Sequence, residues 1–200
     1  MSEDNDELDE IKVILVGESG TGKTSLINVA IGEKFDPNSQ STLLSTFVPK
    51  KYERNGKNYT LNIWDTAGQE KFRAMTKIFT KNSKIVIFVY AINNRESFEI
   101  MKTYWVKSIK ESLGDEPIIG IVGNKSDLFL EEKVKEEEGK EFANKLNVNF
   151  KLVTAKEDPV GFVDFMGELL DEFLEKKGIK VKGNNFNINN KPTVKKKKFC

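Results

Sequence analysis

The sequence predicts an α/β fold, with a mostly parallel six-stranded sheet, one antiparallel edge hairpin and helices on both faces. Short apolar runs typical of strands alternate with amphipathic patterns typical of helices, which is the signature of a parallel sheet. The runs at 11–16, 85–90 and 118–122 are apolar nearly throughout, as strands covered on both faces are. A single turn signal near residue 55 separates two further strands and indicates the hairpin.

The first half of the chain supplies one helix and the edge hairpin. A helix is expected over 23–32, directly after the first strand. Strands are expected at 47–54 and 58–64, on either side of Asn55-Gly56. Pro49 has no N–H to donate to a neighbouring strand, so the strand at 47–54 should lie at the edge of the sheet.

The second half alternates helices with strands. Helices are expected over 95–113, 131–146 and 159–177, and the last strand at 148–153. The final helix has the clearest boundaries, because Asp158 can cap it, Pro159 suits its first position and Gly178 suits its end. Its apolar stripe should face the core and consists of Phe162, Phe165, Met166, Leu169, Leu170 and Phe173.

Composition suggests one domain with a short segment at each end. Residues 1–10 form an acidic arm that we expect to be disordered, 11–177 form the domain, and 178–200 form an Asn- and Lys-rich flexible tail. The net charge is +1, and nothing resembles a nucleic-acid recognition module, so no nucleic-acid partner is expected. The chain contains no histidine, which excludes His-based catalysis and His zinc sites.

The segment Gly17 to Thr24 reads GESGTGKT and matches the phosphate-binding pattern G-x-x-x-x-G-K-[ST] between a strand and a helix. In such a loop, backbone N–H groups and the helix N-terminus hold phosphate. Lys23 would reach the β- and γ-phosphates, and Thr24 would give its hydroxyl to Mg²⁺. The expected nucleotide-binding residues of this segment are Gly17, Glu18, Ser19, Gly20, Thr21, Gly22, Lys23, Thr24 and Ser25.

The sequence Asn124-Lys125-Ser126-Asp127 is expected to select the base of the nucleotide. It follows a buried strand, at the edge where ligands bind in such sheets. A carboxylate there can accept two hydrogen bonds from guanine N1–H and its exocyclic amine, a pair that adenine lacks, so Asp127 would select guanine. In Thr154-Ala155-Lys156, after the last strand, a backbone N–H, expected from Ala155, can contact guanine O6.

The segment Asp65-Thr66-Ala67-Gly68-Gln69 closes the third strand and carries the groups for hydrolysis. Asp65 would hold Mg²⁺, mostly through water, and the Gly68 amide would meet the γ-phosphate. Gln69 would orient the attacking water, so Gln69 and Lys23 are the expected catalytic residues.

With these motifs in this order, the chain resembles small GTPases of the Ras superfamily, and the Rab family most of all, over roughly residues 12–173. The resemblance implies the P-loop NTPase fold known as the small G domain, and binding of GTP and GDP with Mg²⁺. It places Phe35 against the guanine and Lys125 along it, with Asn124 bracing the loop. Thr42 of the first switch would supply a hydroxyl to Mg²⁺ and its N–H to the γ-phosphate. An aromatic triad that reads switch state would comprise Phe47, Trp64 and Phe79.

The resemblance also implies a monomer that meets an exchange factor, a GTPase-activating protein and effectors reading the two switches. Two departures affect those partners: Leu44 stands where the family usually has glycine, and Phe79-Thr80 replaces a tyrosine pair. Three other interpretations stay open. They are a nucleotide-locked scaffold that scarcely hydrolyses GTP, a Ras-like signalling GTPase outside the Rab family, and a membrane adaptor without nucleotide.

The chain ends in four consecutive lysines, Lys195 to Lys198, followed by Phe199 and Cys200. This resembles a prenylated C-terminus, although Rab proteins usually end in paired cysteines. A lipid on Cys200 with the lysine cluster would attach the protein to the cytoplasmic face of an intracellular membrane, between periods in the cytoplasm. Prenylation machinery or a GDP-dissociation inhibitor would then be partners. A plain solvated tail or a shortened C-terminus is the alternative.

Overall fold

The computed structural model describes residues 9–38, 46–65, 80–114 and 116–181. These residues contain a six-stranded sheet in the order β2-β3-β1-β4-β5-β6. Only β2 and β3 pair antiparallel, and the other neighbours are parallel. The strands are β1 (Glu10–Val16), β2 (Thr46–Arg54), β3 (Lys57–Asp65), β4 (Ile85–Ala91), β5 (Ile118–Asn124) and β6 (Asn149–Leu152). The predicted fold class is therefore confirmed.

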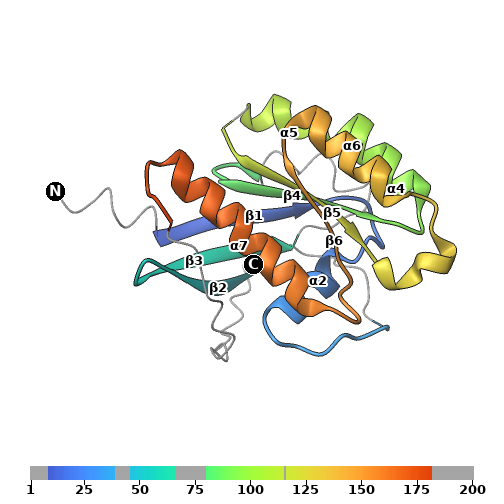
Figure 1. Cartoon of the computed structure of the whole chain (residues 1–200), viewed down its shortest axis with the longest axis horizontal. Coiled ribbons are helices and arrows are strands. Elements are labelled where there is room, and N and C mark those ends of the chain that lie inside the picture. The colour runs from blue at the N-terminus through green and yellow to red at the C-terminus, as the bar shows by residue number, and fades with distance from the viewer. Residues whose placement is uncertain (1–8, 39–45, 66–79, 115, 182–200) are drawn as a thin grey trace.

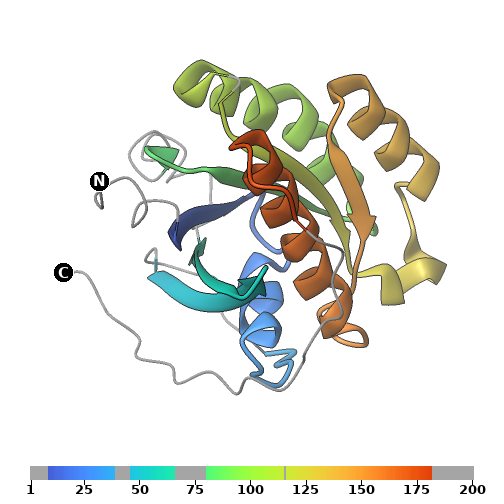
Figure 2. The same ribbon diagram turned by 60° about the vertical axis from the view of Figure 1, so that its left-hand side comes forward.

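Helices cover both faces of this sheet (Figures 1 and 2). On one face, α2 (Lys23–Ala30) and α7 (Pro159–Lys176) pack over one apolar cluster. On the other face, α6 (Glu136–Leu146) and a long helix pack over a second cluster. The long helix comprises α4 (Arg95–Ile100), the π turn η2 (Met101–Trp105) and α5 (Val106–Leu113). Every residue of β4 is buried between the two layers, as its apolar run predicts.

The edge hairpin and the last helix form as expected. Asn55 and Gly56 have φ of 54° and 75°, which suits a two-residue turn, and β2 lies at the sheet edge. The Asp158 side chain accepts the Gly161 N–H at 3.1 Å and caps α7. Gly178 follows α7 with φ of 80°, a conformation that ends a helix.

Two predicted helices differ from the structure. The helix expected over 95–113 forms, but it contains the π turn η2. The helix expected over 131–146 begins only at Glu136, and a 3₁₀ helix, η3 (Ser126–Glu131), precedes it. The N–H groups of Lys133 and Val134 both donate to the Ile92 carbonyl oxygen, so this stretch is bound to the end of β4 and cannot join α6.

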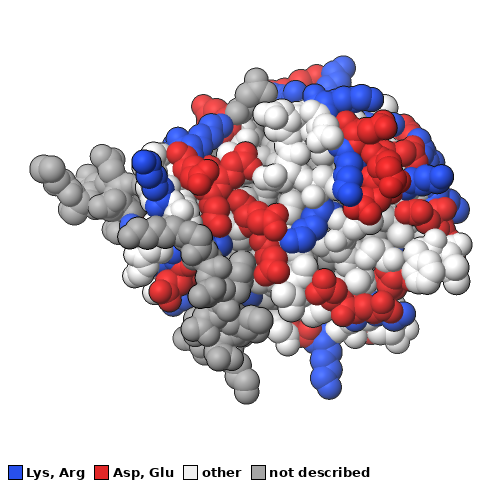
Figure 3. Space-filling model, in the orientation of Figure 1, with Lys and Arg blue, Asp and Glu red and all other residues white. Residues whose placement is uncertain are grey.

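The exposed side of α7 is mostly acidic (Figure 3), because the helix carries Asp164, Glu168, Asp171, Glu172 and Glu175. Arg54 of β2 forms an ion pair with Asp171 and ties the edge strand to α7. None of the helices in the described part of the chain is both long and apolar enough to cross a bilayer.

Candidate nucleotide-binding site

The loop between β1 and α2 runs so close to its neighbours that two of its positions require glycine. A Cβ on Gly17 would lie 2.1 Å from the Val89 carbonyl oxygen. A Cβ on Gly22 would lie 2.3 Å from Asn124 Nδ2, and the φ of Gly22, 89°, is one that other residues rarely adopt. The backbone of this loop therefore packs directly against β4 and the end of β5, too closely for side chains at these two positions. Such a close-packed, glycine-rich backbone is typical of a loop that cradles phosphate.

The ammonium group of Lys23 lies over this loop. Lys23 is 5% exposed, and its Nζ donates to the carbonyl oxygens of Gly17 and Glu18, both at 2.8 Å. Burial lowers the pKa of Lys23 to about 8, while the carboxylates of Asp65 and Glu18 act in the opposite direction. A buried cation held by carbonyl oxygens is suited to receive the phosphate oxygens of a nucleotide.

Thr24 and Asp65 bring two oxygen atoms together beside the loop. The Thr24 hydroxyl donates to Asp65 Oδ2 at 2.8 Å, and Asp65 is 4% exposed at the end of β3. The two residues meet because β1 and β3 are parallel neighbours whose carboxyl ends share one edge. Hydroxyl and carboxylate oxygens are ligands that Mg²⁺ prefers, so this pair fits the predicted metal site.

Asn124, at the end of β5, links the phosphate loop to the next motif. Its Nδ2 donates to the Thr21 carbonyl oxygen at 2.8 Å, which provides the predicted brace. Its Oδ1 is buried and accepts no hydrogen bond from the described residues, so it is an acceptor suited to a bound polar ligand. Lys125 then turns the chain with φ of 65° into η3.

Asp127 is held by the motif that follows β6. Its Oδ1 accepts the Thr154 hydroxyl at 2.6 Å, and its Oδ2 lies 3.7 Å from Lys156 Nζ. The Thr154 oxygen in turn accepts the Lys156 N–H at 3.1 Å. The Ser126 N–H donates to the Val153 carbonyl oxygen at 3.1 Å, and Ala155 is buried beside these groups. The structure therefore places the two predicted base-binding motifs in direct contact.

We expect Thr154→Val to speed GDP release about tenfold, because the hydroxyl is a donor to a carboxylate and its loss leaves Asp127 less firmly oriented. Release of a fluorescent GDP into excess unlabelled GDP measures the rate. Thr154→Ser keeps the hydroxyl, so its rate of GDP release should stay much closer to that of the native protein. Equal rates for the valine and serine variants would contradict the role given to this hydrogen bond.

The remaining predicted site residues within the described part of the chain lie around the contacts described above. Ser19 and Gly20 are exposed at the tip of the loop, and Ser25 is half-buried in the first turn of α2. Phe35 packs partly against the core beneath α2 and α7, and its contact with guanine stays a prediction. Phe47 and Trp64 stack with ring centroids 5.1 Å apart, so two members of the predicted triad are neighbours.

Several predictions lie outside the described residues. They concern Thr42 and Leu44 of the first switch, Gly68, Gln69 and Phe79 of the second, and Lys195 to Lys198 and Cys200 of the tail. The roles assigned to these residues stay predictions.

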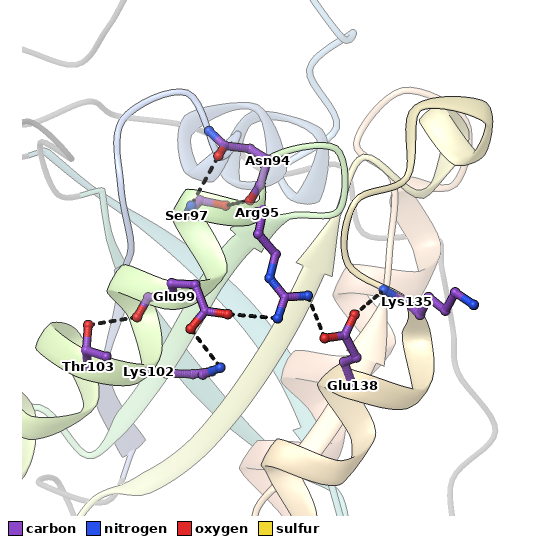
Figure 4. Close-up of polar contacts among 8 residues, drawn as sticks. All are labelled: Asn94, Arg95, Ser97, Glu99, Lys102, Thr103, Lys135 and Glu138. Atoms are coloured by element: carbon purple, nitrogen blue, oxygen red, sulfur yellow. Dashed lines mark hydrogen bonds and ion pairs between the residues drawn. The ribbon is translucent and has the colours of Figure 1, made fainter.

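Sequence patterns missed a polar network that joins α4 to α6 (Figure 4). Arg95 forms ion pairs with Glu99 on its own helix and with Glu138 on α6, and Glu138 also accepts the Lys135 N–H at 3.2 Å. The hydrogen bond from Arg95 holds the pKa of Glu138 below its usual value. Asn94 begins this helix by accepting the Ser97 N–H at 3.2 Å. The network joins the first turns of α4 and α6 through ion pairs whose side chains are partly exposed.

The fold and this site together define a P-loop protein with the arrangement used for guanine nucleotides. The model of the Ras family matches residues 12–173, and the chain belongs to that family of small GTPases. Family membership brings guanine-nucleotide binding, GTPase activity and regulation by exchange factors, activating proteins and effectors.

Similar proteins carry Rab names. The chain is 38% identical over 193 residues to Ras-related protein RabC of Dictyostelium discoideum, covering 94% of this chain and 96% of the relative. It is 37% identical over 164 residues to Ras-related protein Rab-21 of Geodia cydonium, covering 82% and 71%. It is 35% identical over 149 residues to human Ras-related protein Rab-22A, covering 74% and 76%. The chain is thus a Rab-like small GTPase, and the resemblance inferred from its motifs is confirmed.

Proposed function

We propose that this chain is a Mg²⁺-dependent switch in membrane trafficking, active when GTP is bound and reset by hydrolysis to GDP. The observation that carries the proposal is a continuous chain of contacts along one edge of the sheet. Asn124 braces the loop that carries Lys23, while Asp127, three residues on, is oriented by Thr154. Groups suited to guanine and groups suited to phosphate are therefore linked by hydrogen bonds through residues 124–127.

In this proposal, different described residues bind the phosphates, the Mg²⁺ ion and the guanine. Lys23 would exchange its carbonyl partners for phosphate oxygens, and backbone N–H groups of the loop would complete the cradle. Thr24 and Asp65 would hold Mg²⁺, which neutralises charge on the β- and γ-phosphates when it is bound. Asp127 would accept the two guanine donors, since Thr154 and Lys156 already orient its carboxylate.

Hydrolysis transfers the γ-phosphoryl group to water. In this proposal Gln69 orients the water, and the Thr42 and Gly68 amides contact the γ-phosphate. Loss of that phosphate removes both contacts and so changes the two switch segments. The described residues place no arginine at the phosphate loop, so fast turnover should require an activating protein that supplies one.

Gln69→Leu tests the hydrolytic half of the proposal. Native protein should hydrolyse GTP slowly, on the order of 10⁻⁴ to 10⁻² per second, the range of related switches. The leucine variant should be about tenfold slower or more, with GTP affinity nearly unchanged, because it loses the water-orienting amide and no ground-state phosphate contact. Single-turnover hydrolysis of preloaded GTP, with and without an activating protein, measures both rates.

The outcomes separate the alternative functions. A native protein that retains GTP without hydrolysing it would favour the nucleotide-locked scaffold. Equal hydrolysis by native protein and Gln69→Leu under both conditions would remove the role given to Gln69. Native protein purified without any guanine nucleotide, and unable to take it up, would favour the adaptor without nucleotide.

We further propose that the tail carries the protein to membranes through a prenyl group on Cys200. One lipid chain alone binds a bilayer only marginally, and a basic cluster supplies the second signal. The segment from Lys182 to Cys200 contains six lysines and no acidic residue, whereas the exposed side of α7 is mostly acidic. The attraction to an anionic leaflet would therefore come from the tail, and the nucleotide-binding domain would stand away from the bilayer.

A further inference from the structure

One tryptophan joins the second face of the sheet to the phosphate loop. Trp105 is the last residue of the π turn η2 and is 3% exposed. Its Nε1 donates to Glu18 Oε1 at 2.9 Å, across 87 positions of sequence. We propose that Trp105 is a positioning residue of the nucleotide site, which holds Glu18 and so slows the release of bound GDP. This inference rests on the proposed binding of guanine nucleotides.

Glu18 is the residue of the loop through which such a contact would act. Its carbonyl oxygen accepts two hydrogen bonds, from Lys23 Nζ at 2.8 Å and from the Thr21 hydroxyl at 2.9 Å. Its carboxylate also favours the charged form of Lys23. A shift of Glu18 would therefore move both the carbonyl that holds the Lys23 ammonium and a negative charge beside the phosphate site.

Fixing that carboxylate matters because the loop binds anions. A carboxylate that changed its position could compete with phosphate for Lys23 or repel the phosphate directly. The indole N–H is a donor only, and it engages one carboxylate oxygen of Glu18. Hydrogen bonds to charged groups are stronger than those between neutral groups, so this contact can hold the side chain in one position.

The helix that carries Trp105 is itself fixed. Asn94 caps its start, and Arg95 ties its first turn to Glu138 of α6 (Figure 4). Met101 and Ile109 are fully buried on either side of Trp105, and Tyr104 packs against its ring edge-on at 5.0 Å. A π turn holds more residues than an α turn, so it rotates the residues beyond it relative to an uninterrupted helix. π turns are often found at functional sites, and this one ends on the residue that contacts the loop.

A tryptophan that only filled the core would affect GDP release differently from one that positions Glu18. If Trp105 served only to fill the core, its replacement would lower stability but would change GDP release equally whether or not Glu18 was present. If it positions the loop, its effect should depend on the Glu18 carboxylate. A double-mutant cycle separates these two roles.

The experiment measures release of fluorescent GDP from Trp105→Phe, Glu18→Ala and the double variant. Trp105→Phe keeps an aromatic ring and removes the N–H. It should speed release about tenfold, the size expected for a lost hydrogen bond to a charged group. In the Glu18→Ala background the same change should alter the rate by less than about twofold, because the bond is already absent. Ile109→Val, a buried change on the same helix, is the control for lost packing and should alter release by less than about twofold.

Fluorescence supplies a second readout that does not need Trp105 to be replaced. The sequence has two tryptophans, so in Trp64→Phe protein the emission comes from Trp105. Glu18→Ala in that background should shift the emission maximum to shorter wavelength, because the indole loses its charged hydrogen-bond acceptor.

Equal acceleration by Trp105→Phe in both backgrounds, or an unchanged emission maximum, would overturn the inference. So would a release rate for Ile109→Val as fast as that for Trp105→Phe. Failure of the proposed function has a different signature, since native protein would then retain no GDP. Native protein that retains GDP but shows no coupling between residues 18 and 105 would overturn only this inference.

Discussion

Asp127→Asn should weaken GDP binding by about 10⁴-fold, the loss seen when a site built for a paired polar contact cannot make it. The carboxylate accepts from both guanine donors, whereas the amide offers one acceptor and a donor that guanine cannot use there. The Thr154 hydroxyl can still donate to the amide oxygen, which leaves the amide N–H₂ group in place of the carboxylate oxygen that guanine needs. Equilibrium competition against fluorescent GDP measures the loss.

The same variant should gain affinity for xanthosine diphosphate, whose exocyclic oxygen needs a donor. Asp158→Asn is a matched control, because it makes the same chemical change nearby while an asparagine can still cap α7. Its GDP affinity should stay within about twofold of native, since capping by either residue is nearly equivalent. Unchanged GDP affinity in Asp127→Asn, or no gain for the xanthine nucleotide, would contradict the assignment of the base site.

Cys200→Ser should move the protein from the membrane fraction to the cytosol in its own cells. The serine hydroxyl cannot be prenylated, and the lysine cluster alone gives weak, salt-sensitive attachment. Changing Lys195 to Lys198 into glutamine should weaken attachment by up to about 10³-fold, at roughly 1 kcal/mol per lysine near an anionic leaflet. Fractionation at low and high salt measures both effects, and mass spectrometry of the native C-terminus identifies the modification.

Neither tail variant should change GTP affinity, because the changed residues follow the domain and lie apart from every nucleotide-binding residue in the sequence. Their GTP affinities therefore serve as the folding control. Cys200 found unmodified in protein from its own cells, together with purely cytosolic fractionation, would leave a soluble GTPase and end the membrane proposal.

The parts of the fold that depend on local sequence were predictable. The buried strands, the Asn55-Gly56 turn, the edge position of β2 and the caps of α7 each follow from a short pattern, and each is present. The late start of α6 was not predictable in this way. It depends on hydrogen bonds from Lys133 and Val134 to Ile92, about 40 positions earlier, and no local pattern encodes such a contact.

In the candidate site, too, local motifs were predictable and contacts between distant segments were not. Motif spacing placed Lys23, Asp65 and Asp127 at one edge of the sheet, because parallel strands end together. The hydrogen bond from Thr154 to Asp127 and the one from Trp105 to Glu18 join distant segments. The motif that contains Thr154 predicts a place for this residue in the nucleotide site. No local pattern marks Trp105 in this way, since an aromatic residue in an amphipathic helix is usually a core residue.

The central claim is that this edge of the sheet is a site for guanine nucleotides. The most direct test is a competition in Mg²⁺ between GTP and ATP for native protein loaded with fluorescent GDP. Because adenine cannot supply the donor pair that Asp127 accepts, GTP should displace the label at concentrations at least about 10⁴-fold lower than ATP. Displacement by GTP and ATP at equal concentrations would contradict the account.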